Sequence, residues 1–300
     1  MTIKEFKLFF SEALSEKYPK TEIDSFFFIL MEEKLQLQRI DTVLQPNFLI
    51  VDDILSELKN STKRLQKEEP IQYILGKTEF YGLPFLVDKN TLIPRPETEE
   101  LVAWVLQSIQ DLKFKNQDSD TTNNNVKPLS ILDIGTGTGC IPISFAKHQP
   151  NATISAIDVS NEALKIAKQN AILNNVEVNF IKKDILQTEN LNELFDVIVS
   201  NPPYITGAEM RDLSPEVLNF EPHIALTPDM TPDNDGLDSY RIIARDAPGF
   251  MTDGAWLIVE IGPLQAPDVC GFFREAGLVD VSIRHDLDGR DRVVVGRKPA

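Results

Sequence analysis

The 300-residue sequence predicts an α/β fold, with a mostly parallel seven-stranded sheet preceded by a small helical-bundle domain. From Leu129 onward, hydrophobic stretches typical of buried strands alternate with helical segments, which favours a parallel sheet covered by helices on both faces. Only residues 286–290 separate the last two predicted strands, too few for a helical crossover, so we expect these strands to pair antiparallel. The expected strands are 130–134, 153–158, 177–181, 195–200, 255–261, 279–284 and 291–296.

Residues 1–72 show helical periodicity and predict the helical domain. Apolar residues recur at helix spacing from Phe6 to Leu14, a second helix is expected over 26–37, and a third is expected to open at Phe48. This segment contains ten basic and thirteen acidic residues, a composition unsuited to binding nucleic acid. We interpret the domain as a docking module for a protein substrate, with a purely stabilising cap as the alternative.

Aromatic residues alternate with glycine and proline in residues 73–92, which indicates a short hairpin linking two domains. A helix is predicted to open at Pro96, because proline and acidic side chains suit a first helical turn. The predicted organisation is therefore a helical domain over 1–72, a hairpin linker over 73–92 and the α/β domain over 93–300.

Composition narrows the class of partner. A formal charge of −16 without a basic cluster argues against a nucleic-acid partner, because such binding requires a positive surface. No apolar run reaches the roughly 20 residues of a membrane helix, and the charged amino terminus does not resemble a signal peptide. Cys140 and Cys270 lack metal-ligand spacing and fit a reducing cytoplasm, so we expect a cytoplasmic protein without a metal.

A glycine turn, residues 135–139, follows the first strand of the α/β domain. Gly135, Gly137 and Gly139 permit positive φ and close approach of the backbone to a ligand. The spacing differs from the G-x-G-x-x-G of dinucleotide sites, and Asp133 just before the turn would repel phosphate. A cationic ligand without phosphate fits better, and S-adenosylmethionine is the common one.

Two further acidic residues follow the next strands. Asp158 ends the second strand, where a carboxylate can accept hydrogen bonds from a ribose diol. Asp184 follows the third strand and can accept from the adenine amino group, with Ile185 packing on the ring. The alternative interpretation for Asp133 and Asp158 is that they only cap the following helices.

The strand at 195–200 leads into Asn-Pro-Pro-Tyr at 201–204, which we call the Asn-Pro-Pro-Tyr turn. Two prolines stiffen the backbone at the carboxyl end of a strand, where ligands bind in open α/β sheets. The Asn201 side-chain oxygen and the Pro202 carbonyl are two acceptors suited to a planar NH2 group, and Tyr204 can form a stacking wall. An ordinary turn is the alternative.

These motifs resemble class I (Rossmann-like) methyltransferases that modify a planar NH2 nitrogen. Ile-Pro-Arg-Pro-Glu-Thr-Glu at 93–99, Val-Glu-Ile-Gly at 259–262 and Asp-Gly-Arg-Asp-Arg at 288–292 narrow the resemblance to the release factor glutamine N5-methyltransferases, the PrmC/HemK family. The resemblance covers nearly the whole chain. The sequence departs from the family pattern before Asp235-Gly236-Leu237, where Thr-Pro-Asp occurs twice.

The resemblance implies methyl transfer from S-adenosylmethionine to the side-chain amide nitrogen of the glutamine in the Gly-Gly-Gln motif of class 1 peptide chain release factors, in translation termination. It implies that Asn201, Pro202 and Tyr204 are catalytic and that Asn201, Pro202, Pro203 and Tyr204 bind the substrate. The implied cofactor-binding residues are Asp133, Gly135, Thr136, Gly137, Thr138, Gly139, Asp158, Asp184, Ile185 and Asn201.

Two other functions remain open at this point. An adenine-N6 methyltransferase acting on RNA or DNA would use the same tetrapeptide on a flipped base, although the acidic amino-terminal domain counts against it. A nucleoside-binding module without catalysis, which recruits a partner through its helical domain, is the second alternative.

Overall fold

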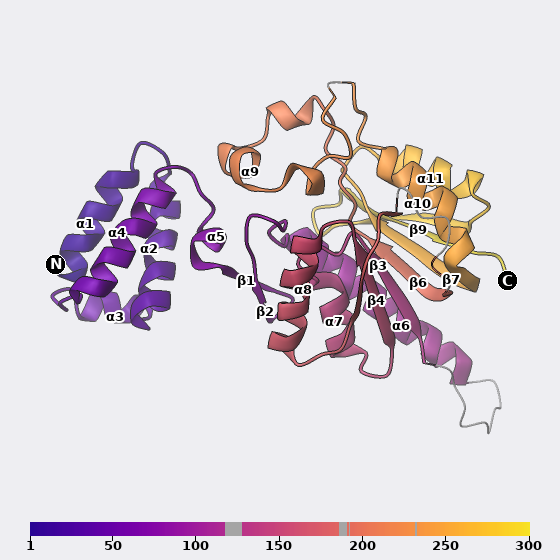
Figure 1. Cartoon of the computed structure of the whole chain (residues 1–300), viewed down its shortest axis with the longest axis horizontal. Coiled ribbons are helices and arrows are strands. Elements are labelled where there is room, and N and C mark those ends of the chain that lie inside the picture. The colour runs from indigo at the N-terminus through magenta and orange to yellow at the C-terminus, as the bar shows by residue number, and fades with distance from the viewer. Residues whose placement is uncertain (118–127, 186–190, 192, 232) are drawn as a thin grey trace. The chain divides into compact units, whose positions relative to one another are not determined.

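The computed structural model describes residues 1–117, 128–185, 191, 193–231 and 233–300 (Figure 1). It divides into two compact units. One comprises Met1–Leu75 with Ser214–Phe220, and the other comprises Gly76–Leu213 with Glu221–Ala300. None of the helices in these ranges is both long and apolar enough to cross a lipid bilayer.

The smaller unit is helical. Its helices are α1 (Ile3–Leu14), α2 (Lys20–Leu35), α3 (Arg39–Leu44), α4 (Asp52–Leu65), α5 (Ile71–Leu75) and α9 (Pro215–Phe220). Thr2 and Glu5 form a capping box that satisfies backbone N–H groups at the start of α1. Phe6, Phe10 and Phe27 are buried in a shared aromatic core, so apolar periodicity does produce the predicted bundle.

The predicted start of the third helix at Phe48 is wrong, and α3 was not foreseen. The Ile3 N–H donates to the Phe48 carbonyl and the Ile50 N–H donates to the Met1 carbonyl, so this segment pairs with the amino terminus in extended form. Helix α4 begins only at Asp52. Pairing between segments distant in sequence therefore overrides the local helical pattern.

The larger unit is built on a seven-stranded sheet of order β5-β4-β3-β6-β7-β9-β8. Its strands are β3 (Ser130–Ile134), β4 (Thr153–Asp158), β5 (Asn179–Lys182), β6 (Phe195–Ser200), β7 (Met251–Glu260), β8 (Val279–His285) and β9 (Asp291–Arg297). Among these seven strands, β9 runs in the direction opposite to the other six, and it pairs antiparallel with both β7 and β8. This confirms the fold class and the antiparallel pairing of the last two strands.

Helices cover both faces of this sheet (Figure 1). One layer contains α6 (Pro96–Gln117), α7 (Cys140–His148) and α8 (Asn161–Asn174), and the other contains α10 (Asp238–Asp246) and α11 (Ala266–Glu275). Side chains alternate between the two layers along each strand, so Ile131 belongs to one core and Leu132 to the other. Both faces are therefore apolar, as the hydrophobic strands predicted.

A two-stranded hairpin, β1 (Lys77–Phe80) and β2 (Leu83–Leu86), lies in the larger unit. Asn170 of α8 is fully buried and exchanges two hydrogen bonds with the Leu86 backbone, at 2.6 and 3.0 Å. Asn174, one turn further along α8, donates to the Pro84 carbonyl. The hairpin is thus fastened to the helix that follows β4.

From β3 the chain first adds β4 and β5 on one side of the sheet and then returns to add β6 on the other side of β3. The direction in which strands are added therefore reverses between β3 and β6. At such a point the loops after the strands diverge and leave a crevice at the carboxyl ends. Short 3-10 helices, η2 (Glu209–Arg211), η3 (His223–Ala225) and η4 (Ala247–Phe250), occur in the connections between β6 and β7. The site described below lies at this crevice.

Candidate active site

A cavity of about 260 Å³ opens at the carboxyl ends of β3, β4 and β6, within the larger unit. Most of its exposed lining is apolar. Predicted site residues that line it are Gly135, Gly137, Asp158, Asp184, Ile185, Asn201, Pro202 and Pro203. The fold therefore collects at one place residues that span 69 positions in sequence, as expected for strands that end at one sheet edge. Within the described ranges, no three His, Cys, Asp or Glu side chains cluster as a metal site would require.

The three glycines of the glycine turn adopt positive φ, between 54° and 79°. A Cβ added at Gly135 or Gly137 would meet no atom within 4 Å, so these two positions face open space. Gly139 differs, because a Cβ there would lie 3.0 Å from Ile143 and 3.1 Å from Ala167. The first two glycines thus leave room for a ligand and the third permits close packing of α7 on α8.

The threonines of the glycine turn are buried and do not line the cavity. The Thr138 carbonyl accepts a 2.9 Å hydrogen bond from Asn170, which joins the turn to α8 and, through Asn170, to the hairpin. The Thr136 carbonyl accepts from the Gly139 N–H at 2.8 Å and closes the turn. These residues shape the backbone that faces the cavity.

Asp133 lies at the end of β3, fully buried behind the glycine turn. Within the described part of the chain, neither of its carboxylate oxygens has a hydrogen-bond partner. Burial raises the pKa of Asp133 to about 7, against the opposing effect of the nearby Thr136 hydroxyl, which makes no hydrogen bond of good geometry. A buried carboxylate without partners is costly, and a cationic group bound at the turn would relieve that cost.

Asp158 ends β4 and lines the cavity. Its carboxylate accepts hydrogen bonds from the Gly137 and Ser160 backbone N–H groups, each at 2.8 Å. Burial raises its pKa, and the two backbone donors oppose that rise. Each carboxylate oxygen can accept more than one hydrogen bond, so Asp158 fixes the glycine turn and still has acceptor capacity toward the cavity.

Asp184 and Ile185 lie just beyond β5 and line the cavity together with Lys183. Ile185 is half-buried and packs against the core on the α10 and α11 side of the sheet. Asp184 and Ile185 therefore line the cavity together with Asp158, and the sequence predicts that the adenine of the cofactor binds to them.

Asn201 follows β6 and lines the cavity with Pro202 and Pro203. Its Nδ2 donates a 3.0 Å hydrogen bond to the Thr98 hydroxyl at the start of α6. The Thr98 hydroxyl in turn donates to the carboxylate of Glu260, at the end of β7, at 2.8 Å. Among the described residues none hydrogen-bonds the Asn201 Oδ1, so the acceptor capacity of that atom is unused in the structure.

Glu260 is almost fully buried, at 1% exposure. Burial raises its pKa to about 7, and Thr98, Arg292 and Asn201 oppose the rise, while Glu97 adds to it. The carboxylate is therefore partnered, unlike that of Asp133. Neither Glu260 nor Thr98 can be assigned a role of its own from the sequence. An acidic residue at the end of an apolar strand is the sequence signal that could have indicated Glu260.

Tyr204 does not line the cavity. Its side chain is half-buried against the core on the α10 and α11 side, and burial together with the Glu260 charge raises its pKa to about 12. Its carbonyl accepts a 3.0 Å hydrogen bond from the Gln265 side chain, whose Oε1 accepts from the Gly262 N–H. Packing of Tyr204 against a substrate therefore stays a prediction.

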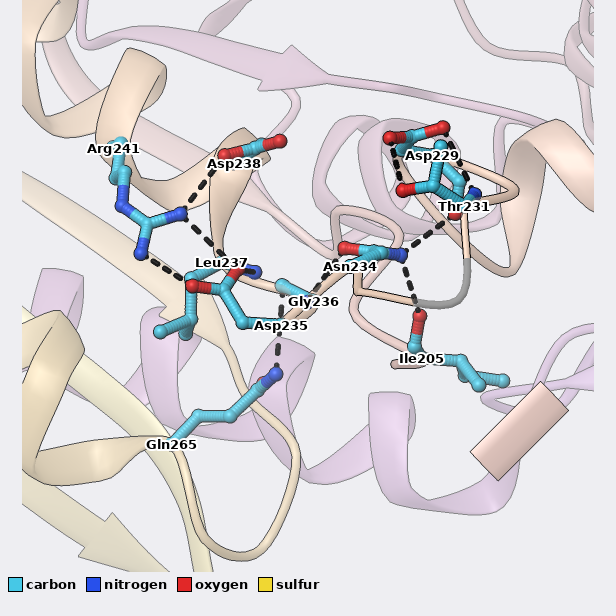
Figure 2. Close-up of polar contacts among 10 residues, drawn as sticks. All are labelled: Ile205, Asp229, Thr231, Asn234, Asp235, Gly236, Leu237, Asp238, Arg241 and Gln265. Atoms are coloured by element: carbon cyan, nitrogen blue, oxygen red, sulfur yellow. Dashed lines mark hydrogen bonds and ion pairs between the residues drawn. The ribbon is translucent and has the colours of Figure 1, made fainter. Parts of the chain in front are cut away.

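Asn234, which follows the doubled Thr-Pro-Asp, supports the backbone after Tyr204 (Figure 2). Asn234 donates to the Ile205 carbonyl at 3.3 Å, and its Oδ1 accepts from the Gly236 N–H at 2.7 Å. Gly236 has a φ of +73°, and a Cβ there would overlap the Tyr204 carbonyl oxygen and lie 2.9 Å from Gln265 Nε2. Figure 2 shows the Gln265 side chain extending toward Gly236 from the side away from Asn234.

Two wall segments of the cavity were not foreseen, residues 90–92 and 224–228. The buried Glu221 carboxylate joins them by accepting from Arg95, at 2.6 Å, and from the Ile93 N–H, at 3.3 Å. Burial raises the pKa of Glu221, and Arg95 opposes that rise. Arg95 lies in the proline-rich stretch 93–99 and is half-buried, and its charge-assisted hydrogen bond to Glu221 fixes the geometry of this wall.

Comparisons with known proteins agree with this geometry. Residues 120–219 match the family model described as the methyltransferase small domain, and residues 9–76 match the PrmC N-terminal domain. A methyltransferase from Pyrococcus furiosus superimposes with a TM-score of 0.51 at 14% identity, over 83% of this chain and all of that one. The hMettl16 catalytic domain superimposes with a TM-score of 0.53 at 16% identity, over 82% and 81%. Fold and site define a Rossmann-like, S-adenosylmethionine-dependent methyltransferase.

Sequence relatives narrow the class further. The release factor glutamine methyltransferase of Flavobacterium psychrophilum is 43% identical over 294 residues, 98% of each chain. The protein of the same name from Bacteroides thetaiotaomicron is 34% identical over 96% of this chain and 97% of its own. That from Lactococcus lactis is 40% identical over 82% and 83%. The chain belongs to the release factor glutamine methyltransferase family.

Proposed function

We propose that this protein transfers a methyl group from S-adenosylmethionine to the side-chain amide nitrogen of the glutamine in the Gly-Gly-Gln motif of class 1 peptide chain release factors, in the cytoplasm. The observation that carries the proposal is the arrangement of Asn201, whose NH2 group is held by Thr98 while its Oδ1 remains available in the cavity. An amide nitrogen of a substrate presents two hydrogens, which such an acceptor can bind.

The cavity fits S-adenosylmethionine. Gly135 and Gly137 leave open space, and the unpartnered carboxylate of Asp133 lies behind them where a cationic ligand would stabilise its charge. The residues proposed to hold the cofactor are Asp133, Gly135, Thr136, Gly137, Thr138, Gly139, Asp158, Asp184, Ile185 and Asn201. When bound, the cofactor supplies an electrophilic methyl group on a sulfonium.

The protein's own contribution is to position the nucleophile. An amide nitrogen is a poor nucleophile because its lone pair is delocalised, so alignment has to supply much of the rate. We propose that Asn201 Oδ1 and the Pro202 carbonyl accept the two amide hydrogens at roughly 3 Å. These acceptors orient the nitrogen and favour the positive charge that develops on it in the transition state. Tyr204 is proposed to contribute to this substrate pocket.

We propose that residues 1–72 dock the release factor and that residues 73–92 link this domain to the catalytic part, residues 93–300. In support, α3 and the segment after it expose large apolar side chains, which single folded domains usually cover. These exposed side chains are Ile40, Val43, Leu44, Phe48, Leu49 and Val51. A protein substrate whose glutamine lies in a loop needs such a second contact to present that loop.

The experiment that tests the function is methyl transfer from radiolabelled S-adenosylmethionine to a purified release factor, to the same release factor with the Gly-Gly-Gln glutamine replaced by alanine, and to total RNA. We expect label only in the unmodified release factor, with the methyl located on that glutamine by mass spectrometry. Label in the RNA arm alone would instead assign an adenine-N6 activity.

The docking role has a separate measurement. Leu44→Ser is expected to raise the KM for the release factor by roughly tenfold, because apolar contact area is lost, and to leave kcat within about twofold. Methylation of a short Gly-Gly-Gln peptide, which lacks the rest of the release factor, serves as the control and should not change. A fall in kcat with both substrates would contradict a docking role.

A further inference from the structure

Three side chains from separate elements form one hydrogen-bonded chain behind the cavity. Asn201 Nδ2 donates to the Thr98 hydroxyl at 3.0 Å, and that hydroxyl donates to Glu260 Oε2 at 2.8 Å. Thr98 and Glu260 are 3% and 1% exposed, so water does not compete for these contacts. Neither Thr98 nor Glu260 lines the cavity, and the hydrogen bonds connect both of them to it through Asn201.

Resting on the function proposed above, we propose that Thr98 and Glu260 are positioning residues that fix which end of the Asn201 amide faces the cavity. An ionised carboxylate can only accept hydrogen bonds. The Thr98 proton therefore points at Glu260, and its oxygen is left to accept from the Asn201 NH2 group. That order leaves Oδ1, the atom that the substrate amide requires, toward the cavity.

Protonation of Glu260 reverses the order. A neutral carboxyl group donates its proton, so the Thr98 hydroxyl can accept from Glu260 and donate to Asn201. The Asn201 amide then lowers its energy by rotating so that Oδ1 faces Thr98. Its NH2 group would face the cavity and could not accept a hydrogen from a substrate amide. Activity is therefore expected only when Glu260 is ionised.

The surroundings of Glu260 place this change near neutral pH. Burial raises its pKa to about 7, Arg292 on β9 lowers it, and Glu97 on α6 raises it further. The other titratable groups that sense its charge remain neutral there, because burial raises the pKa of Tyr204 and Cys140 to about 12 and that of Tyr240 well above its usual value. The positive charge of Arg292 is shared with Asp286, at 3.2 Å.

The first test observes the Asn201 side chain directly, without turnover. In the full chain labelled with 15N-asparagine, Asn201→Ser identifies the NH2 signal by its disappearance. Between about pH 5.5 and about pH 8.5, the Asn201 signal is expected to titrate with a midpoint near 7. The titration should vanish in Glu260→Gln and persist in Asp133→Asn, which removes the other carboxylate with a pKa of about 7. A signal that does not move with pH in the unsubstituted protein would overturn the proposal.

The second test separates the hydroxyl of Thr98 from its shape. Thr98→Val keeps the branched side chain and removes the hydroxyl, so kcat is expected to fall roughly 10- to 100-fold with little change in the Kd for S-adenosylmethionine. Thr98→Ser keeps the hydroxyl and loses the methyl group, and should restore kcat to within about threefold. If Thr98 only packs, Thr98→Val should retain a higher kcat than Thr98→Ser, and that result would refute the proposal.

Thr252→Val is a matched control. Thr252 also donates its hydroxyl to a carboxylate, that of Asp196 at 2.9 Å, but at the opposite end of β6 and β7. We expect its kcat to stay within about twofold. If kcat falls as far as in Thr98→Val, general destabilisation explains both results and the positioning role is refuted.

The two proposals fail in different ways. Absence of release factor methylation, with an Asn201 signal that titrates and depends on Glu260, would reject the proposed substrate and keep the positioning role. Methylation that proceeds unchanged in Glu260→Gln and Thr98→Val would keep the substrate and reject the positioning role.

Discussion

The two buried carboxylates at the carboxyl edge of the sheet differ in their partners. Asp133 ends β3 behind the glycine turn and has no hydrogen-bond partner among the described residues, whereas Glu260 ends β7 behind the Asn-Pro-Pro-Tyr turn and accepts from Thr98. Burial raises the pKa of each to about 7. The first site is incomplete without a ligand, and the second is complete and holds a protein side chain. We therefore propose that the first region binds the cofactor and that the second positions Asn201.

The largest expected effect comes from removing the positioned side chain. Asn201→Ala should lower kcat for release factor methylation by about 1000-fold, because a preorganised acceptor of this kind contributes on that order. The Kd for S-adenosylmethionine, measured by calorimetry, should change less than about tenfold. If this variant retains its turnover, Asn201 has no role in the mechanism, and the proposed difference between the Asp133 and Glu260 regions is wrong.

Backbone support of the Asn-Pro-Pro-Tyr turn should matter almost as much. Gly236→Ala places a Cβ onto the Tyr204 carbonyl oxygen and must displace it. A shift of about 1 Å near the reacting groups costs on the order of 100-fold in rate, so we expect a fall in kcat of that size. Gly254→Ala is the control, since Gly254 has a similar φ of +80° but open space around it.

The binding region is tested by Asp133→Asn. Loss of a charged acceptor should raise the Kd for S-adenosylmethionine by roughly 10- to 100-fold, with a smaller effect on kcat at saturation. Chemical denaturation provides the second measurement. Asp133 binds its proton more tightly in the folded chain, where its pKa is about 7, than in the unfolded chain, where it is near 3.8. In wild type the free energy of unfolding should therefore fall as pH rises from about 4 to about 7.

The asparagine variant lacks this proton linkage. At pH 8 we expect it to be more stable than wild type by about 1 to 3 kcal/mol, although it binds the cofactor more weakly. Equal or lower stability at that pH, with an unchanged slope below it, would show that Asp133 is partnered in solution.

The smallest effect compares two glycines of one turn by thermal unfolding. Gly139→Ala should cost about 2 to 3 kcal/mol, because positive φ penalises a side chain and Ile143 and Ala167 crowd the new Cβ. Gly137→Ala, in open space, should cost about 1 kcal/mol from φ alone. Equal losses would mean that Gly139 is not a packing position.

The positions of the strands along the chain could be predicted because each strand carries its own hydrophobic signal. Strands β3, β4 and β6 begin and end where the sequence placed them. Strand β7 starts earlier, at Met251 rather than residue 255, because Asp253 and Gly254 read locally as a break while pairing with β6 sustains the strand. The failed helix start at Phe48 has the same cause, since partners distant in sequence decided the backbone.

The site could be predicted as far as its motifs reached. Each of the two motifs, 135–139 and 201–204, is continuous in sequence and follows a predicted strand. Because those strands end at the same edge of the sheet, Gly135, Gly137 and residues 201–203 line one cavity. Thr98 and Glu260 could not be assigned in this way, because their role exists only when α6, β6 and β7 are brought together. The walls at 90–92 and 224–228 depend on tertiary contact for the same reason.

Asn170 sets where the chain can be divided. Its amide hydrogen-bonds both the Leu86 backbone and the Thr138 carbonyl. A fragment that begins after the hairpin would therefore leave a fully buried amide without its Leu86 partners and loosen the glycine turn. A catalytic fragment intended for crystallography or inhibitor screening should therefore begin at Gly76, the first residue of the larger unit, and retain the hairpin as an integral part of it.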